Sequence, residues 1–151
     1  MKLAEVLIFR ADLQKRIEHL SKRMQRNSRV QEGEAPLEDP QQLMTEFDAL
    51  TDQLRDLVQR INRTNSSSPL VGEPGLTIAD AIAQRDSLRL SHKTYNELCE
   101  SAAIDRPRYG RSEIKFLPAL DVQVQSDAFA RQHRELDVRI QETNWLVELA
   151  D

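Results

Sequence analysis

At 151 residues, the chain is long enough to form one domain with a buried core. Hydrophobic residues make up 39% of it and charged residues 30%, which excludes a disordered chain and is typical of a charged helical protein. Aromatic residues are only 5%, which argues against a large β-sheet. The single cysteine, Cys99, excludes an intrachain disulfide, so we expect a cytoplasmic location.

No apolar run approaches the roughly 18 residues that a membrane-spanning helix needs. The short apolar run at residues 6–9 is interrupted at once by Arg10 and Asp12, so it lacks the length of a signal-peptide core. We therefore expect no membrane partner.

Charge is distributed unevenly along the first 58 residues. Residues 1–30 carry eight basic and three acidic side chains, whereas residues 31–58 carry eight acidic side chains and one basic. The basic block could be a nucleic-acid arm, or a basic helix that pairs with the acidic helix after it. The opposite signs of neighbouring blocks favour the second interpretation, so we expect no nucleic-acid partner.

Apolar residues at spacings of four and three predict helices over about residues 3–29 and 40–64. The second helix has the most regular seam: Leu43, Phe47, Leu50, Leu54, Leu57, Ile61 and Thr64. Asp39 followed by Pro40 predicts an N-cap and a first helical residue. Gly33 and two prolines make residues 30–40 a linker, so the two helices are expected to form an antiparallel hairpin. Residues 65–75, rich in Ser, Pro and Gly, are expected to form a mobile loop.

Two further helices are predicted over about residues 77–104 and 122–150, with Thr77 and Asp80 as an acidic capping box. Alternating polar and apolar residues predict a short strand at 113–117. The fold class is therefore all-α: a single domain of four long helices, an antiparallel coiled coil or four-helix bundle, with a short strand or hairpin between helices 3 and 4. No internal repeat is apparent beyond the shared heptad rhythm.

No motif for chemistry stands out. His19, His92 and His133 share no helix face, Cys99 has no partner cysteine, and no Gly-rich phosphate loop is present. We therefore expect no metal site, cofactor or catalytic residue. The cluster Arg106, Arg108 and Arg111 could hold an anion, but ion pairing is the simpler interpretation.

Polar residues interrupt the predicted seams, and these invite a hypothesis of their own. Arg10 lies in the first seam, and Arg85 and His92 lie in the third. Because a charge in a seam is costly unless paired, we expect Arg10 or Arg85 to form a buried ion pair within the bundle or across a subunit contact.

The chain resembles a septicolysin-like family of small bacterial proteins. The segments that carry the resemblance are Arg10–Gln14, Val30–Pro36, Arg60–Asn62 with Thr64-Asn65, Arg85-Asp86 with Leu88, Ser112–Lys115, and Leu136-Asp137 with Ile140-Gln141 and Asn144-Trp145. The resemblance implies a helical, bundle-type fold with no assigned activity. The family name implies a cytolysin, which would make the protein membrane-active.

Three functions follow as hypotheses. The first, a non-enzymatic homo-oligomeric assembly or binding protein, is favoured by heptad helices with few aromatic residues. The second is a ligand-binding protein or enzyme with a polar site near Glu32, Asn62 and Arg85. The third is the membrane-active cytolysin. The candidate ligand or interface residues are Arg10, Glu32, Glu34, Asn62, Asn65, Arg85, Asp86 and Glu113.

Overall fold

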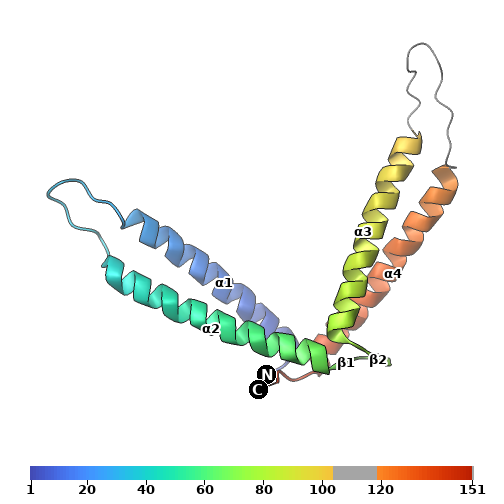
Figure 1. Cartoon of the computed structure of the whole chain (residues 1–151), viewed down its shortest axis with the longest axis horizontal. Helices are drawn as coiled ribbons and strands as arrows, with labels where there is room; N and C mark the ends of the chain where they lie inside the picture. Colours follow the sequence, from blue (N-terminus) through green and yellow to red (C-terminus); the bar gives the residue numbers. More distant parts are fainter. Residues whose placement is uncertain (104–118, 151) are drawn as a thin grey trace, which may run out of the picture. The chain divides into compact units, whose positions relative to one another are not determined.

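A computed structural model describes residues 1–103 and 119–150. Four helices dominate these residues, so the prediction of an all-α fold is confirmed. The elements follow in the order α1 (Leu3–Arg26), α2 (Pro40–Ser67), β1 (Pro69–Leu70), β2 (Glu73–Thr77), α3 (Ile78–Ala103) and α4 (Ala119–Leu146) (Figure 1). The strand expected at 113–117 lies outside the described residues, as do Glu113 and the three arginines near it.

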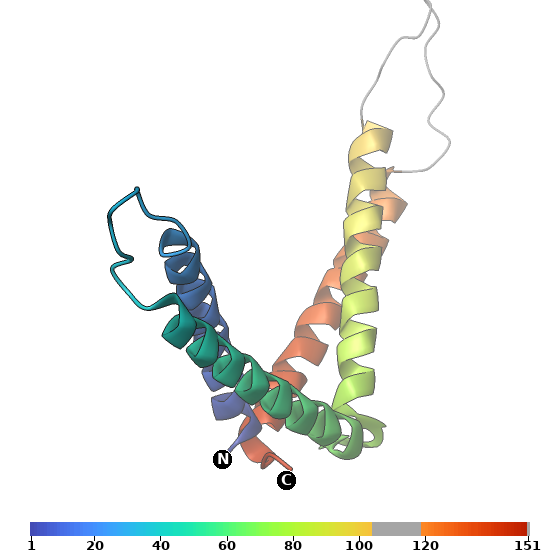
Figure 2. The same ribbon diagram turned by 60° about the vertical axis from the view of Figure 1, so that its left-hand side comes forward.

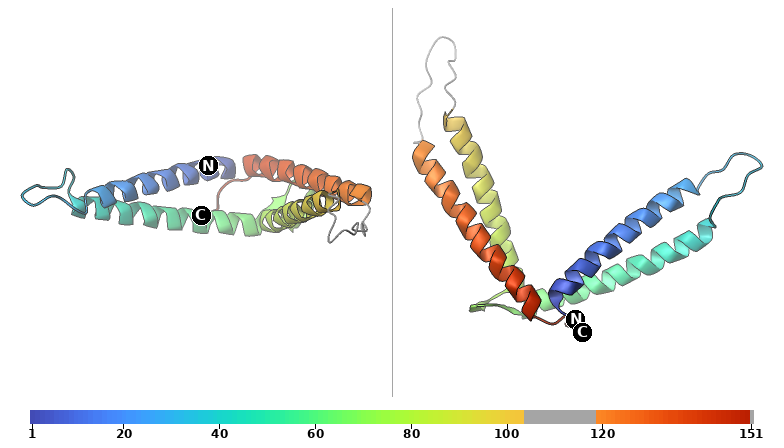
Figure 3. Two further views of the ribbon diagram at one scale, coloured as in Figure 1. Left: turned by 90° about the horizontal axis from the view of Figure 1, so that it is seen from above. Right: turned by 180° about the vertical axis from the view of Figure 1, so that it is seen from behind.

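The described chain divides into two compact units. The first unit is Met1–Ser68 with Asn144–Asp151, and the second unit is Pro69–Thr143. In the first unit α1 and α2 run antiparallel, side by side, in all views (Figure 3). In the second unit α3 and α4 form a similar pair (Figure 2), with the β-hairpin at the start of α3. That the two units unfold together, as a single domain would, stays a prediction.

The predicted seams form the cores. In the first unit Leu13, Leu20, Leu43 and Leu50 are buried together, with Phe47 and Leu54 packed against them. In the second unit the buried cluster consists of Leu70, Ala81, Leu136 and Ile140. Burying apolar side chains at about 25 cal/mol per Å² is the main term that holds each pair of helices together.

The helix starts follow the predicted caps. The Asp39 carboxylate accepts a hydrogen bond from the Gln41 amide at 2.9 Å, and Pro40 is the first residue of α2. The Thr77 hydroxyl accepts from the Asp80 amide at 3.1 Å, while the Asp80 carboxylate accepts from the Thr77 hydroxyl at 2.6 Å. Helix α1 ends at Arg26, three residues before its predicted end, because the amide group of Asn27 bonds to the Arg23 carbonyl and to Glu38.

The prediction of a loop at residues 65–75 was wrong. Helix α2 continues to Ser67, and a two-stranded antiparallel hairpin follows it. The Ser67 hydroxyl donates to the Arg63 carbonyl one turn back, which lets a serine continue a helix. Gly72, at a φ of +76°, makes the turn between β1 and β2, a conformation that suits glycine.

The two units are repeats of one sequence pattern, which corrects the expectation that no repeat exists. A shift of 75 aligns α1 with α3, and a shift of 79 aligns α2 with α4. The aligned pairs are Leu3-Ala4-Glu5 with Ile78-Ala79-Asp80, Arg10 with Arg85, Leu13 with Leu88, Leu57 with Leu136, Arg60-Ile61 with Arg139-Ile140, and Thr64-Asn65 with Thr143-Asn144. Because the two helix pairs need different shifts, no single shift shows the whole repeat.

Candidate functional site

The aligned Arg and Thr residues hold the chain in the same way in both units. In the first unit Arg60 Nε donates to the Ala150 carbonyl at 2.9 Å, and the Ala150 amide donates to the Thr64 hydroxyl at 3.0 Å. In the second unit Arg139 Nη2 and the Thr143 hydroxyl bind the carbonyl and amide of Val71, each at 3.1 Å.

A shift of 79 also aligns Val71 with Ala150. Each motif thus fixes a residue of its own unit, Ala150 in the first and Val71 in the second. Thr64 and Thr143 are 1% and 0% exposed, so we assign this motif to the fold and not to a ligand.

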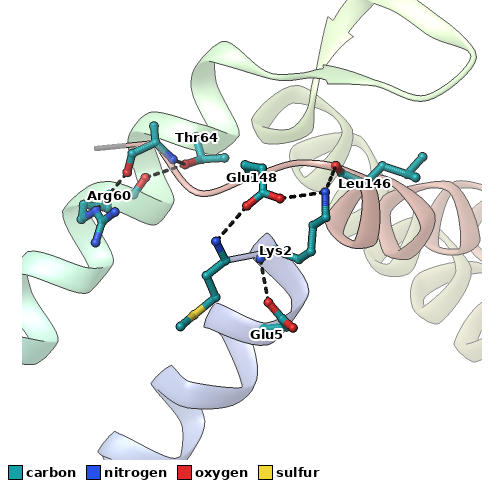
Figure 4. Close-up of polar contacts among 8 residues, drawn as sticks. Lys2, Glu5, Arg60, Thr64, Leu146 and Glu148 are labelled. Atoms are coloured by element: carbon teal, nitrogen blue, oxygen red, sulfur yellow. Dashed lines mark hydrogen bonds and ion pairs between the residues drawn. The ribbon is translucent and has the colours of Figure 1, made fainter.

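The two chain ends meet in the first unit, beside the Arg60–Thr64 motif (Figure 4). Lys2 and Glu148 form an antiparallel bridge, and the Leu3 amide donates to the Val147 carbonyl at 2.9 Å. The Glu148 carboxylate accepts hydrogen bonds from the Met1 amino group at 2.8 Å and forms an ion pair with Lys2 at 2.9 Å. These cations lower the pKa of Glu148 from 4.5 to about 2.

A cavity of about 640 Å³ lies beside this junction in the first unit. Its lining mixes apolar and polar side chains: Met1, Phe9, Gln53, Asp56, Leu57, Arg60 and Leu149. Sequence reasoning missed it because it is assembled from three segments far apart in the chain.

The predicted site residues of the first unit do not converge. Glu32 and Glu34 lie in the loop between α1 and α2, whereas Asn62 and Asn65 lie near the other end of α2. The 22 helical steps from Pro40 to Asn62 rise by about 33 Å. Glu32 and Asn62 therefore cannot bind one small molecule together.

The loop between α1 and α2 has a cavity of its own, of about 740 Å³, which Glu34 helps to line. Arg23 pairs with Glu38 through two nitrogens, and Asn27 accepts from the Glu38 amide at 3.0 Å. The hydrogen bond from the Arg23 guanidinium to the Glu38 carboxylate lowers the pKa of Glu38. Among the described residues, Arg23–Glu38 is the one ion pair that links the basic and acidic blocks, because no residue of α1 pairs with one of α2.

Arg85 makes an ion pair between the helices of its seam, as predicted, but the pair is half-buried and not buried. Its guanidinium lies 3.1 Å from Asp137 of α4 and 3.1 Å from Asp86, with 22% of the side chain exposed. Arg89 also pairs with Asp86, at 2.8 Å. Arg85 and Asp86 thus belong to one charged network between α3 and α4.

Arg10, the aligned counterpart of Arg85, has no such partner. Its Nε atom is buried and makes no hydrogen bond within the described residues, and the same is true of the Asn144 side-chain oxygen. The counterpart of Asp137 in the first unit is Val58, which cannot accept a hydrogen bond. The repeat therefore explains why Arg10 lacks a carboxylate.

The second unit also contains a histidine–serine pair. His92 Nδ1 lies 3.1 Å from the Ser126 hydroxyl, which resembles part of a nucleophilic site. Ser126 is 0% exposed, so a substrate cannot reach it, and we assign the pair to the polar seam. No cluster of three metal-binding side chains occurs among the described residues.

The outer face of α4, opposite its seam with α3, is the strongest candidate for a functional surface. Six exposed residues recur there at spacings of four and three: Leu120, Val124, Asp127, Arg131, Arg134 and Val138. The three apolar side chains among them are 75%, 59% and 66% exposed. We call these six residues the outer face of α4.

The outer face has no equivalent on α2. The aligned positions of the first unit are all polar: Gln41, Thr45, Asp48, Asp52, Arg55 and Gln59. Since the same helix position tolerates polar residues in one unit, the fold does not require apolar ones in the other. Leu120, Val124 and Val138 thus form an exposed apolar stripe at heptad spacing that the fold alone does not explain.

The fold and these surfaces define a class of protein: an all-α chain made of two repeated helical hairpins, with a heptad-patterned outer face on the second. The chain belongs to a family of unknown function, DUF6847, whose model matches residues 10–149.

It is similar to a functionally unknown conserved protein from Corynebacterium diphtheriae, known from a crystal structure. The identity is 39%, 99% of each chain is covered, and the TM-score is 0.88. None of the curated proteins searched matches this chain.

These comparisons correct the resemblance to a septicolysin-like family. The family model and the similar structure both carry a description of unknown function, and neither supports a septicolysin. Of the quoted segments, Arg60–Asn62 with Thr64-Asn65 overlaps the Arg–Thr motif of the first unit, and Asn144-Trp145 directly follows that of the second. Within the described residues, no helix is long and apolar enough to cross a membrane.

Proposed function

We propose that this protein is a non-enzymatic, homo-oligomeric assembly or binding protein that associates through the outer face of α4. The observation that carries the proposal is the exposure of Leu120, Val124 and Val138 on that face. Burying one such aliphatic side chain in an interface would contribute about 1.5–3 kcal/mol to the free energy of association. The single cysteine, Cys99, suits a reducing compartment, so we extend the proposal to the cytoplasm.

The solution mass of the full chain over a range of concentrations tests this proposal. We expect a mass above the 17.4 kDa of one chain, rising with concentration. The double variant Leu120→Glu with Val138→Glu is expected to remain folded by circular dichroism but to have the mass of one chain. The matched control, Gln41→Glu with Gln59→Glu at the aligned positions of α2, is expected to keep the wild-type mass. A wild-type mass of one chain at every concentration would overturn the proposal.

The loop cavity of the first unit favours a second candidate function, the binding of an anionic ligand. Arg26 and Arg29 line this cavity, and neither makes an ion pair within the described residues. Titration of the chain with inorganic phosphate, followed by calorimetry, tests this function. A saturable signal that Arg26→Ala with Arg29→Ala removes would support it, and the absence of a signal at millimolar phosphate would contradict it.

A further inference from the structure

The charges of the outer face select one orientation for a second copy. Within this face Asp127 lies between Val124 and Arg131, and Arg134 follows before Val138. In a parallel pair of α4 helices each residue would face its own copy, so Asp127 would oppose Asp127 and Arg131 would oppose Arg131. Like charges placed directly opposite each other destabilise an interface, so the charges disfavour a parallel pair.

An antiparallel pair removes every like-charge contact from the same six positions. In heptad packing of antiparallel helices, positions of one class face positions of the other class. The register centred on residue 129 places Leu120 opposite Val138 of the second copy and Asp127 opposite Arg131. It also places Val124 opposite Arg134, whose aliphatic stem can cover a valine while its charged end reaches water. A two-fold axis repeats each of these contacts.

We propose that two copies of this chain associate through the outer faces of α4, antiparallel about a two-fold axis near residue 129, with reciprocal Asp127–Arg131 ion pairs. This inference rests on the proposed self-association and adds its orientation and register. Asp127, Arg131 and Arg134 are exposed and make no ion pair within the described residues. The Asp127 carboxylate accepts a hydrogen bond from Gln123 at 2.8 Å, which leaves its charge unneutralised for a partner. A second copy is the one partner whose charge pattern is known to complement this face, since the face complements itself.

The contact is small, so the association should depend on concentration. One helix from each chain buries less than the roughly 1,600 Å² of a standard stable interface. We therefore expect a dimer that dissociates on dilution. Raising the salt concentration should weaken it further, because its central ion pairs lie near the surface.

Charge reversal tests the register. Asp127→Arg alone places Arg opposite Arg131 twice, and Arg131→Asp alone places Asp opposite Asp127 twice. Each variant should therefore raise the dissociation constant by about 10- to 100-fold, as measured by analytical ultracentrifugation. An equimolar mixture of the two variants restores both ion pairs, so it should form heterodimers with near wild-type affinity. The chain that carries both substitutions should dimerise again with itself.

Asp48→Arg is the matched control, because Asp48 aligns with Asp127 but lies on the polar face of α2. It should leave the dissociation constant unchanged, and helix content should be the same in all variants. If the wild type is a single chain at all concentrations, the proposed function and this register both fail. If the wild type associates but single reversals have no effect, or the mixture is not rescued, only the register is overturned.

Discussion

The first and second units use one set of contacts to build two different surfaces. In both, an Arg and a Thr one turn apart on the second helix bind the carbonyl and amide of the same distant residue. In both, an acidic residue caps the first helix, since Glu5 accepts from the Lys2 amide as Asp80 accepts from the Thr77 amide. The shared residues are those that the fold needs.

The differences between the units lie elsewhere. The seam of the first unit is apolar apart from Arg10, whereas the second pairs its Arg85 with Asp137 and also contains His92 and Ser126. The outward face of the second helix is polar in the first unit and partly apolar in the second. Because the aligned face of α2 is polar, the apolar residues on the outer face of α4 are not explained by what the fold needs.

The largest expected effect is the loss of stability when a buried isoleucine is truncated, and it should be equal in the two units. Ile61 and Ile140 are aligned, and each is 2% exposed. Ile61→Ala and Ile140→Ala should each lower the free energy of unfolding by about 2–4 kcal/mol, since each leaves a cavity in a seam. Urea unfolding followed by circular dichroism measures this loss. Leu37→Ala is the control, because Leu37 is 99% exposed and its loss should cost under about 0.5 kcal/mol.

The same pair of variants tests the prediction of a single domain. If both units unfold together, each variant should shift one common transition. Two transitions, each shifted by only one of the variants, would contradict that prediction.

The aligned threonines should have smaller and local effects. Thr64→Val and Thr143→Val keep the side-chain volume but leave the amides of Ala150 and Val71 without an acceptor. We expect each to cost about 1–2 kcal/mol of stability. Hydrogen exchange should accelerate at Ala150 in the first variant and at Val71 in the second. If either variant accelerated exchange equally at Ala150 and at Val71, the assignment of one Arg–Thr motif to each unit would be contradicted.

The unpaired Arg10 offers a sharper comparison. Val58→Asp places a carboxylate at the position that aligns with Asp137 of the second unit. We expect Arg10 and the introduced carboxylate to couple by about 0.5–1.5 kcal/mol in a double-mutant cycle with Arg10→Met.

The cycle of Arg85→Met with Asp137→Asn supplies the reference value for that coupling. A coupling near zero at Arg10, beside a clear one at Arg85, would show that the two seams differ in geometry and not only in sequence.

Sequence reasoning recovered the parts of the fold that depend on periodicity and caps. The seam from Leu43 to Ile61 and the caps at Asp39 and Thr77 follow from local rules. The extension of α2 through Ser66 and Ser67 did not follow, because serine disfavours helices unless its hydroxyl finds a carbonyl within the same helix. The β-hairpin was missed because its placement depends on Arg139 and Thr143, some 70 residues away.

The candidate surface was hidden for a different reason. Leu120, Val124 and Val138 look like broken periodicity when α4 is given one seam, since they lie opposite Leu136 and Ile140. Comparison with α2 separates the two faces, because the inner Leu136 and Ile140 match Leu57 and Ile61. The three apolar outer residues of α4, by contrast, align with Gln41, Thr45 and Gln59. The repeat could have been found from Arg-Ile-x-x-Thr-Asn at residues 60 and 139, the one stretch where four residues match.

The smallest expected effect is a dependence on pH at the junction of the first unit. Glu148 pairs with the Met1 amino group and Lys2, whereas its aligned counterpart in the second unit is Pro69, which does not titrate. The pKa of Glu148 is about 2 when folded and near 4.5 when unfolded, so the folded state binds fewer protons between these values.

The stabilisation by Glu148 should therefore be complete above about pH 4.5 and lost as the pH falls towards 2. The difference in unfolding free energy between wild type and Glu148→Gln should be constant above pH 5 and should vanish near pH 2. Urea unfolding at half-unit pH steps measures it. A difference near zero at every pH would mean that the ion pair does not hold this junction, and that the backbone bridge of Lys2 with Glu148 does so alone.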